Sequence, residues 1–303
     1  MPSLFTVIIT TKNRPDYLKE AFTSVTQQQG ELPDIIVVDD GSDTPVYQQI
    51  DAELRQHCRI LRNEKSVGVS AARNQGTQAA GTKWLIFLDD DDWLSDTFLR
   101  AMTSTIQQAP SVDFFWPSRT IVYQQSDARK VQQASTAQAS TTEEDADNFL
   151  AALLDATTSG MAFRRSALVA VEGFDEQLTV SEDRDLIFKL LTRRFSAQPV
   201  NAANLYIRVH DGPRLSQNEK KERQAQADLT VVNRHREFLQ GHPKIAYRFI
   251  GRVAKRLWEN GFCKDAVAVT NLQCRIAPYS LRARKRQLGW GLLAVFKQNE
   301  SLS

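Results

Sequence analysis

The segment WLIFLDDDDW, residues 84–93, places a run of apolar residues directly before four aspartates. An apolar run without alternation is typical of a strand that is buried on both faces of a parallel sheet. In open α/β sheets, ligands bind at the carboxyl ends of such strands. We therefore expect residues 84–90 to form a central strand that ends in a binding site.

Upstream segments repeat this pattern. Three further apolar runs predict strands, and they are LFTVII (4–9), DIIVVDD (34–40) and CRILRN (58–63). Helical stretches separate the strands, and they start at Asn13-Arg14-Pro15, at SAARNQGTQAA (70–80) and near residue 96. Repeated strand–helix–strand units predict an α/β fold with an open, mostly parallel, Rossmann-like sheet flanked by helices and joined by right-handed crossovers.

The pattern changes after residue 112. DFFWPSRTIVY (113–123) predicts two strands that join near Pro117, and the polar stretch 124–145 predicts an exposed loop. Helices are expected between residues 148 and 194, and a last strand at 204–210. We expect a catalytic domain over 1–217, with halves at about 1–123 and 145–217, and a helical extension over 218–303.

Composition limits the class of protein. The chain has 303 residues, of which 42% are hydrophobic, and three cysteines without a CxxC pair, which favours reduced thiols in a cytoplasmic protein. No signal peptide and no apolar run of membrane-spanning length is evident, so the chain is expected to be soluble or peripheral at the inner face of the cytoplasmic membrane.

Charge divides the chain into two parts. Residues 219–303 hold 17 Lys+Arg and 7 Asp+Glu, a net of +10, so residues 1–218 carry 21 and 29, a net of −8. Ile245, Phe249, Val253 and Leu257 recur at helical spacing beside basic residues, which predicts a basic amphipathic helix. Such a tail could touch anionic lipids, dock on the acidic part of the chain or form dimers. No recognisable motif supports binding of nucleic acid.

Acidic residues end two of the predicted strands: Asp39-Asp40 and Asp89–Asp92. Adjacent carboxylates beside buried strands repel one another unless a cation joins them, and the hard divalent cations Mn2+ and Mg2+ prefer oxygen ligands. Such a cation suits a nucleotide diphosphate. The alternative is that these acids serve turns or helix caps. Arg73 could bind a diphosphate, hold Asp39 or Asp40 in place, or be an ordinary surface charge.

The ordered motifs resemble glycosyltransferase family 2, a group of inverting sugar transferases with the GT-A fold. The segments that carry the resemblance, which spans about residues 4–216, are TVIITTKNRPDYLKEAFTSV (6–25), IIVVDDGSDT (35–44), SVGVSAARNQGTQAA (66–80), FLDDDDWL (87–94), GMAFRRSALVAVEGFDEQL (160–178) and SEDRDLIFKLL (181–191).

The resemblance implies roles for particular residues. The residues that it places around the nucleotide are Thr10, Thr11, Arg14, Asp39, Asp40, Arg73, Asp89 and Asp91. Either Asp39 or Asp40 would contact the base. FLDDDDWL matches the DxD metal motif, so Asp91 and Asp92 would share the ribose and a manganese or magnesium ion, and His210 could reach the metal.

The "ED" element of the family aligns with Glu182-Asp183. Asp183 is the implied catalytic base and Glu182 the alternate, since an inverting displacement needs one carboxylate to accept the proton of the acceptor hydroxyl. Acids at a helix start are also favoured electrostatically without any catalytic role. Arg208 and Arg214 are candidates to clamp phosphates.

The function that these residues imply is transfer of a sugar from a nucleotide-diphosphate sugar, with a UDP-sugar favoured, to a saccharide or lipid-linked saccharide acceptor. Family habit suggests bacterial surface polysaccharide or lipopolysaccharide synthesis. One alternative is a sugar-1-phosphate nucleotidyltransferase, which the absence of glycine from TTKNRPD (10–16) disfavours. A non-catalytic protein that binds nucleotide sugars or carbohydrate is the other.

Overall fold

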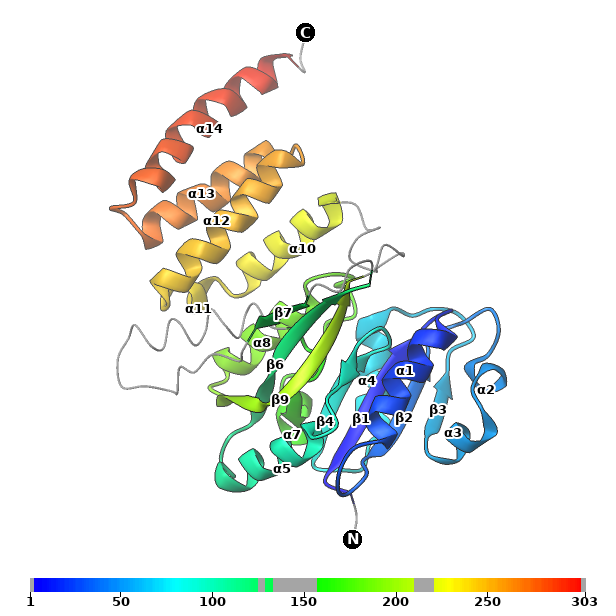
Figure 1. Cartoon of the computed structure of the whole chain (residues 1–303). Helices are drawn as coiled ribbons and strands as arrows, with labels where there is room; N and C mark the ends of the chain where they lie inside the picture. The colour runs from blue at the N-terminus through cyan, green and yellow to red at the C-terminus, as the bar shows by residue number, and fades with distance from the viewer. Residues whose placement is uncertain (1–2, 125–128, 133–156, 210–220, 301–303) are drawn as a thin grey trace. The chain divides into compact units, whose positions relative to one another are not determined.

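The computed structural model of the chain describes residues 3–124, 129–132, 157–209 and 221–300 (Figure 1). The chain divides into two compact units, Met1–Gly212 and Pro213–Ser303. The expected domain boundary at 217/218 lies outside the described residues and stays a prediction. Of the loop expected at 124–145, residues 129–132 instead form a short strand, and residues 125–128 and 133–145 lie outside the described ranges.

The first unit is built on one mixed sheet. Its strands follow the order β3-β2-β1-β4-β8-β6-β9-β5, and β7 pairs with β6. The strands are β1 (Phe5–Thr11), β2 (Asp34–Asp39), β3 (Arg59–Arg62), β4 (Trp84–Asp89), β5 (Trp93–Leu94), β6 (Phe114–Tyr123), β7 (Arg129–Gln132), β8 (Ala162–Arg164) and β9 (Ala197–Val209).

The first four strands of this order pair only in parallel with one another. β1 pairs in parallel with both β2 and β4, and β2 pairs in parallel with β3. Beyond β4 the sheet is mixed: β8 is antiparallel to both β4 and β6, whereas β6 and β9 are parallel. The expectation of a mostly parallel sheet is therefore confirmed for the strands up to β4, whereas the later strands form parallel and antiparallel pairs.

The central strands are buried on both faces. Val7, Ile8 and Ile9 of β1 are consecutive and essentially inaccessible to solvent. Val7 and Ile9 belong to a core that includes Leu18 and Phe22 of α1 (Pro15–Thr26). On the other face, Gly76 of α4 lies so close that an added Cβ would be 2.4 Å from Ile8 Cγ2. This two-sided packing explains the uninterrupted apolar runs.

Helices of the first unit connect and cover these strands. They are α1, α2 (Val46–Gln49), α3 (Ala52–Gln56), α4 (Val69–Ala79), α5 (Phe98–Gln108), α7 (Arg165–Ala170) and α8 (Glu182–Thr192). The helices predicted to start near residues 13, 70 and 96 correspond to α1, α4 and α5.

Residues 113–123 were expected to form two strands, but they form one. Pro117 lies at a register shift: Pro117 pairs with Val200, whereas Ser118 pairs with Asn204. Residues 201–203 of β9 therefore absorb the irregularity, and β6 continues unbroken. A proline is tolerated there because it has no N–H to give to a regular ladder.

The second unit is helical in its described part. Its helices are α10 (Lys221–Arg234), α11 (Arg236–Gln240), α12 (Pro243–Glu259), α13 (Cys263–Ile276) and α14 (Leu281–Glu300). Phe249, Val253 and Leu257 of α12 are almost fully buried. The part of the predicted apolar stripe at 249–257 therefore belongs to the core of this unit rather than to a free surface. Within the described ranges, no helix combines the length and apolar character needed to cross a membrane.

Candidate active site

The carboxyl ends of β2, β1 and β4 lie side by side. In the parallel register Thr11 is opposite Asp39 of β2, and Thr10 is opposite Asp89 of β4. The sheet order thus places the two threonines between the two acidic strand ends. The prediction that both acidic segments lie at one edge of the sheet agrees with this register.

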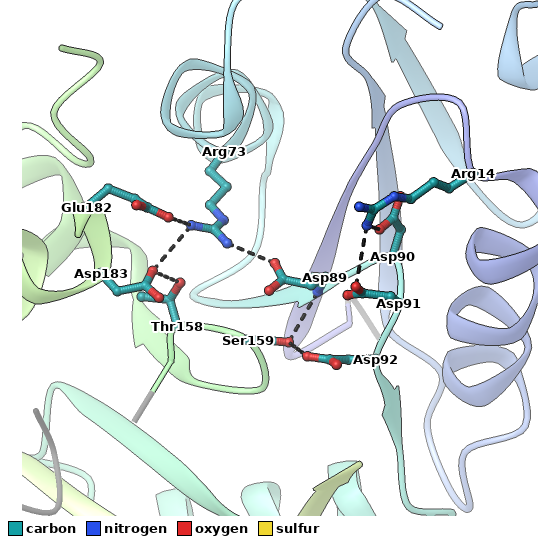
Figure 2. Close-up of polar contacts among 10 residues, drawn as sticks. All are labelled: Arg14, Arg73, Asp89, Asp90, Asp91, Asp92, Thr158, Ser159, Glu182 and Asp183. Atoms are coloured by element: carbon teal, nitrogen blue, oxygen red, sulfur yellow. Dashed lines mark hydrogen bonds and ion pairs between the residues drawn. The ribbon is translucent and has the colours of Figure 1, made fainter. Parts of the chain in front are cut away.

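Arg73 is the central cation of the site (Figure 2). Its Nη2 lies 2.8 Å from Oδ1 of Asp89, and its Nη1 lies 3.1 Å from Oε1 of Glu182 and 3.3 Å from Oδ1 of Asp183. Its side chain is only 4% exposed. Although burial opposes its charge, the carboxylates of Asp89, Asp183 and Glu182 raise the pKa of Arg73.

The ion pairs of Arg73 correct one of the roles expected of it, that it could hold Asp39 or Asp40 in place. Gly76 packs against Ile8 of β1, and Arg73 lies three residues earlier on the same face of α4. Its side chain therefore extends along the sheet to the end of β4 and to α8. An arginine that appeared in the sequence as a helix charge is a buried link between distant segments.

Glu182 and Asp183 open α8 and face this guanidinium (Figure 2). Ser181, the residue before them, has a left-handed backbone (φ 63°), which is costly for a non-glycine residue and turns the chain into the helix. The hydroxyl of Thr158 donates a hydrogen bond to Asp183. Asp183 is the more accessible of the two acids, with its side chain 24% exposed against 13% for Glu182.

Asp90 and Asp91 face the other cation of the site, Arg14. Nη1 of Arg14 lies 3.1 Å from Oδ1 of Asp90 and 3.4 Å from Oδ2 of Asp91, and the hydroxyl of Thr11 donates to Asp90 at 2.7 Å. The predicted group Thr11, Arg14 and Asp91 is therefore brought together. Asp90, to which the family resemblance gave no role, is the acid that Thr11 and Arg14 both contact.

Asp92 contacts a different set of residues from Asp90 and Asp91. It accepts hydrogen bonds from the hydroxyl of Ser159 at 2.9 Å and from the backbone N–H of Arg208 at 3.3 Å. Nε of Arg208 donates to the backbone oxygen of Asp91, and its guanidinium lies 4.8 Å from the centre of the Trp93 ring. Arg208 is thus beside the acidic cluster, and its role as a phosphate clamp stays a prediction. His210 and Arg214 lie outside the described residues.

Asp39 and Asp40 are engaged by the protein itself. Asp39 is fully buried, accepts backbone N–H groups of Ser42 and Val46, and pairs with Arg62. Although burial acts in the opposite sense, these hydrogen bonds hold the pKa of Asp39 below its usual value. The role of Asp39 in contacting a base stays a prediction.

Asp40 anchors the loop that precedes α4. It accepts hydrogen bonds from the Ser66 hydroxyl and from the backbone N–H groups of Val67 and Gly68, at 2.6 to 3.0 Å. These bonds likewise keep the pKa of Asp40 low despite burial. Asp40 therefore fixes this loop, and its contact with a base is also still a prediction.

Burial raises the pKa of several other acids of the site. Burial raises the pKa of Asp90 to about 7, with Arg14 opposing the shift. Burial, together with the charge of Asp183, raises the pKa of Glu182 to about 7. The pKa of Asp92 also rises well above its usual value, because it is buried beside the charges of Asp89 and Asp91. In the described part of the site, the neighbouring arginines thus do not fully offset the burial and mutual repulsion of these three acids.

The acids at the end of β4 suit a divalent cation chemically. Asp91 and Asp92 offer carboxylate oxygens, which Mn2+ and Mg2+ prefer, and a dication would offset the repulsion that burdens Asp92. Within the described ranges, however, no three His, Cys, Asp or Glu side chains are already arranged around a common point. His210, the third predicted ligand, belongs to the part of the chain that is not described.

Three site residues have no counterpart in the expectations from sequence: Thr158, Ser159 and Arg62. Ser159 accepts the N–H of Asp89 and donates to Asp92, while its neighbour Thr158 donates to Asp183. Both are buried. One indication of Ser159 was present in the sequence, because it precedes Gly160 and a glycine often marks a turn. In the structure Gly160 has a positive φ at the turn into β8. Arg62, the partner of Asp39, was also not predicted from the sequence, and it lies opposite Asp39 in the β2–β3 register.

Comparison with known proteins identifies the family, since residues 6–171 match the glycosyl transferase family 2. The chain belongs to this family. It is also 25% identical over 211 residues to an uncharacterized glycosyltransferase of Haemophilus influenzae, covering 68% of this chain and 69% of that protein. Glycosyltransferase GlyG of Streptococcus pneumoniae is 27% identical over 110 residues, 36% of each chain, so that match spans about a third of the relative.

Solved structures agree on the architecture of this glycosyltransferase. The structure of Staphylococcus aureus TarS 1–349 in complex with UDP-GlcNAc superposes with a TM-score of 0.68 at 16% identity, covering 96% of this chain and 89% of that one. The likeness shows the fold. The family 2 glycosyltransferase described here thus has the expected GT-A fold, with a helical C-terminal unit.

Proposed function

We propose that this glycosyltransferase moves a sugar from a nucleoside diphosphate sugar to an acceptor hydroxyl with inversion at the anomeric carbon. The observation that carries the proposal is the position of Arg73, which contacts Asp89 at the end of β4 and Asp183 at the start of α8. The acids suited to the donor and the acid suited to the acceptor thereby border one site.

Asp183 is the proposed base. Its carboxylate takes the proton of the acceptor hydroxyl while the acceptor oxygen bonds to the anomeric carbon. The bond from that carbon to the diphosphate oxygen breaks, and the nucleoside diphosphate leaves with the electron pair from the opposite face. The greater exposure of Asp183 favours it over Glu182, and the Thr158 hydroxyl and Arg73 keep it oriented.

Asp91 and Asp92 would hold Mn2+ or Mg2+, with His210 as a further ligand. When bound, such an ion neutralises the charge that develops on a diphosphate leaving group. Arg14 and Arg208, both against this acidic segment, are suited to contact phosphate oxygens. Thr10 and Thr11, between the strand ends, would line the nucleotide pocket together with Asp39 or Asp40.

A uridine nucleotide is the favoured donor carrier, supported by the TarS structure of similar fold, which is in complex with UDP-GlcNAc. The acceptor would be a saccharide or a lipid-linked saccharide in the synthesis of a bacterial surface polysaccharide or lipopolysaccharide. Within the family, a non-catalytic nucleotide-sugar-binding protein is the competing candidate, which the buried carboxylate excess disfavours because such charges destabilise a fold.

Calorimetric titration of the full chain with UDP, GDP and dTDP tests the proposal, each with Mn2+ and with EDTA. We expect UDP to bind only with metal, and Asp91→Ala/Asp92→Ala to abolish binding while Asp34→Ala, an exposed acid at the start of β2, does not. Asp183→Asn should bind UDP normally yet lose transfer. Absence of nucleotide binding in every condition would contradict the proposal and favour a non-catalytic protein that binds carbohydrate alone.

A further inference from the structure

Helix α14 packs on its own unit through one defined face. Ala283 is buried, Arg286 donates to the backbone oxygen of Gly251, and Gln287 donates to the side chain of Asn271. One turn further, the ring of Trp290 stacks on Trp258 with centroids 4.7 Å apart. These positions, spaced by three and four residues, lie on one side of the helix.

The opposite side of α14 carries large apolar side chains. Leu281, Leu288 and Leu292 are spaced by seven and four residues, and so share a face about half a turn away from Ala283 and Trp290. Their side chains are 76%, 69% and 66% exposed. The outward face of a helix on a globular unit is normally polar. An outward row of leucines is therefore a feature that packing within the unit does not explain.

Basic residues border this row. Arg282, Arg284 and Lys285 are all exposed, with Lys285 within the leucine face and the two arginines on its flanks. Residues 281–293 contain no aspartate or glutamate. A helix with an apolar face between cationic flanks matches the boundary of an anionic bilayer, where leucines enter the acyl region and cations meet lipid phosphates.

We propose that the outward face of α14 is a docking surface for anionic lipid, with the helix lying in the plane of the membrane. Contact with a second copy of the chain is disfavoured, because pairing two such faces would bring like charges together. The inference places the lipid surface on α14 rather than on α12, whose apolar residues Phe249, Val253 and Leu257 are buried. It does not rest on the proposed reaction, since no residue of α14 lies in the catalytic unit.

Flotation of the full chain with vesicles tests the proposal. Phosphatidylcholine vesicles, with and without phosphatidylglycerol, are compared at low and at physiological salt. We expect flotation only with phosphatidylglycerol. Leu288→Gln/Leu292→Gln should lower partitioning by about tenfold for each leucine, and Arg284→Glu/Lys285→Glu by at least about fivefold for each residue. Glutamine is a good helix former, so the first variant should keep α14 helical.

The matched control is Leu32→Gln/Val169→Gln, which removes two exposed apolar side chains from the first unit and should float like the wild type. Failure of the wild type to float with phosphatidylglycerol would overturn the proposal. So would a leucine variant that floats normally, or a wild-type dimer in sedimentation equilibrium that becomes monomeric in the leucine variant without any vesicle binding. Should circular dichroism show that this variant misfolds, the charge reversal decides by the same criteria.

Discussion

Nη2 of Arg73 lies 2.8 Å from Oδ1 of Asp89, which ties a buried arginine on α4 to the last residue of β4. The same guanidinium contacts Glu182 and Asp183 on α8. One cation therefore serves three carboxylates that come from two separate segments of the chain. Removing it would leave like charges facing one another in a partly buried site.

Arg73→Met should accordingly destabilise the protein strongly. We expect the free energy of unfolding at neutral pH to fall by about 3–5 kcal/mol, since the substitution leaves buried carboxylates without their cation. Urea unfolding followed by circular dichroism measures this change. Arg55→Met, at an exposed position on α3, is the control and should stay within about 0.5 kcal/mol of the wild type. Equal effects of the two substitutions would show that Arg73 is not the organising cation.

The raised pKa of Glu182 predicts that the free energy of unfolding depends on pH. Its pKa is raised from 4.5 to about 7 by burial and by Asp183, so the folded state keeps a proton that the unfolded state has lost. The unfolded state binds fewer protons in this window, and stability therefore falls as pH rises from 4.5 to about 7 and levels off above it. One such proton gives a slope of at most about 1.4 kcal/mol per pH unit.

Glu182→Gln removes this titration. Urea unfolding of wild type and variant across this pH range, in EDTA, should give a difference in unfolding free energy that changes with pH in favour of the variant as pH rises. A wild-type curve that runs parallel to the variant's would mean that Glu182 is ionised in the folded protein throughout. Asp90 titrates in both proteins and so cancels in the comparison.

Ser159 offers a test of the cluster around Asp92. Ser159→Ala deletes a buried hydroxyl that donates to Asp92 and accepts from the N–H of Asp89, so stability should fall by about 1–3 kcal/mol. If Asp92 is a metal ligand, losing its supporting hydrogen bond should weaken Mn2+ binding by about 10–100-fold. Calorimetric titration with Mn2+ and UDP measures the second effect.

The control for that experiment is Ser104→Ala, at an exposed position on α5. It should alter neither stability nor metal binding. Unchanged Mn2+ affinity in Ser159→Ala, with the loss of stability present, would argue that Asp92 has a structural role and that the ion is held elsewhere.

Local patterns made the first half of the catalytic unit predictable. The apolar runs that become β1, β2 and β4 are buried on both faces. An uninterrupted apolar sequence was therefore sufficient to predict these buried strands. The acids that end β2 and β4 fall at one edge because parallel strands share a direction. The Glu182-Asp183 pair was found through family resemblance, since acids at a helix start have a common structural explanation.

Long-range pairings were not predictable from these patterns. Arg73 meets Glu182 across 109 positions of sequence, and nothing local to α4 indicates that contact. β8 runs antiparallel to β4, and β6 passes through Pro117 because β9 absorbs the shift. In the second unit, the stripe on α12 and the leucines of α14 look alike in sequence. Only packing shows that the first is buried and the second is exposed.

Gly41 packs against the loop before α4 that Asp40 anchors. Its φ of +75° disfavours any side chain, and an added Cβ would lie 2.6 Å from the backbone nitrogen of Ser66. Gly41→Ala should therefore destabilise the protein by about 1–3 kcal/mol and push the loop away from Asp40. Hydrogen exchange of the Val67 and Gly68 amides, which donate to Asp40, should then accelerate. Gly81→Ala, with open space at its Cβ, is the control, and equal exchange in both variants would contradict the role of Gly41.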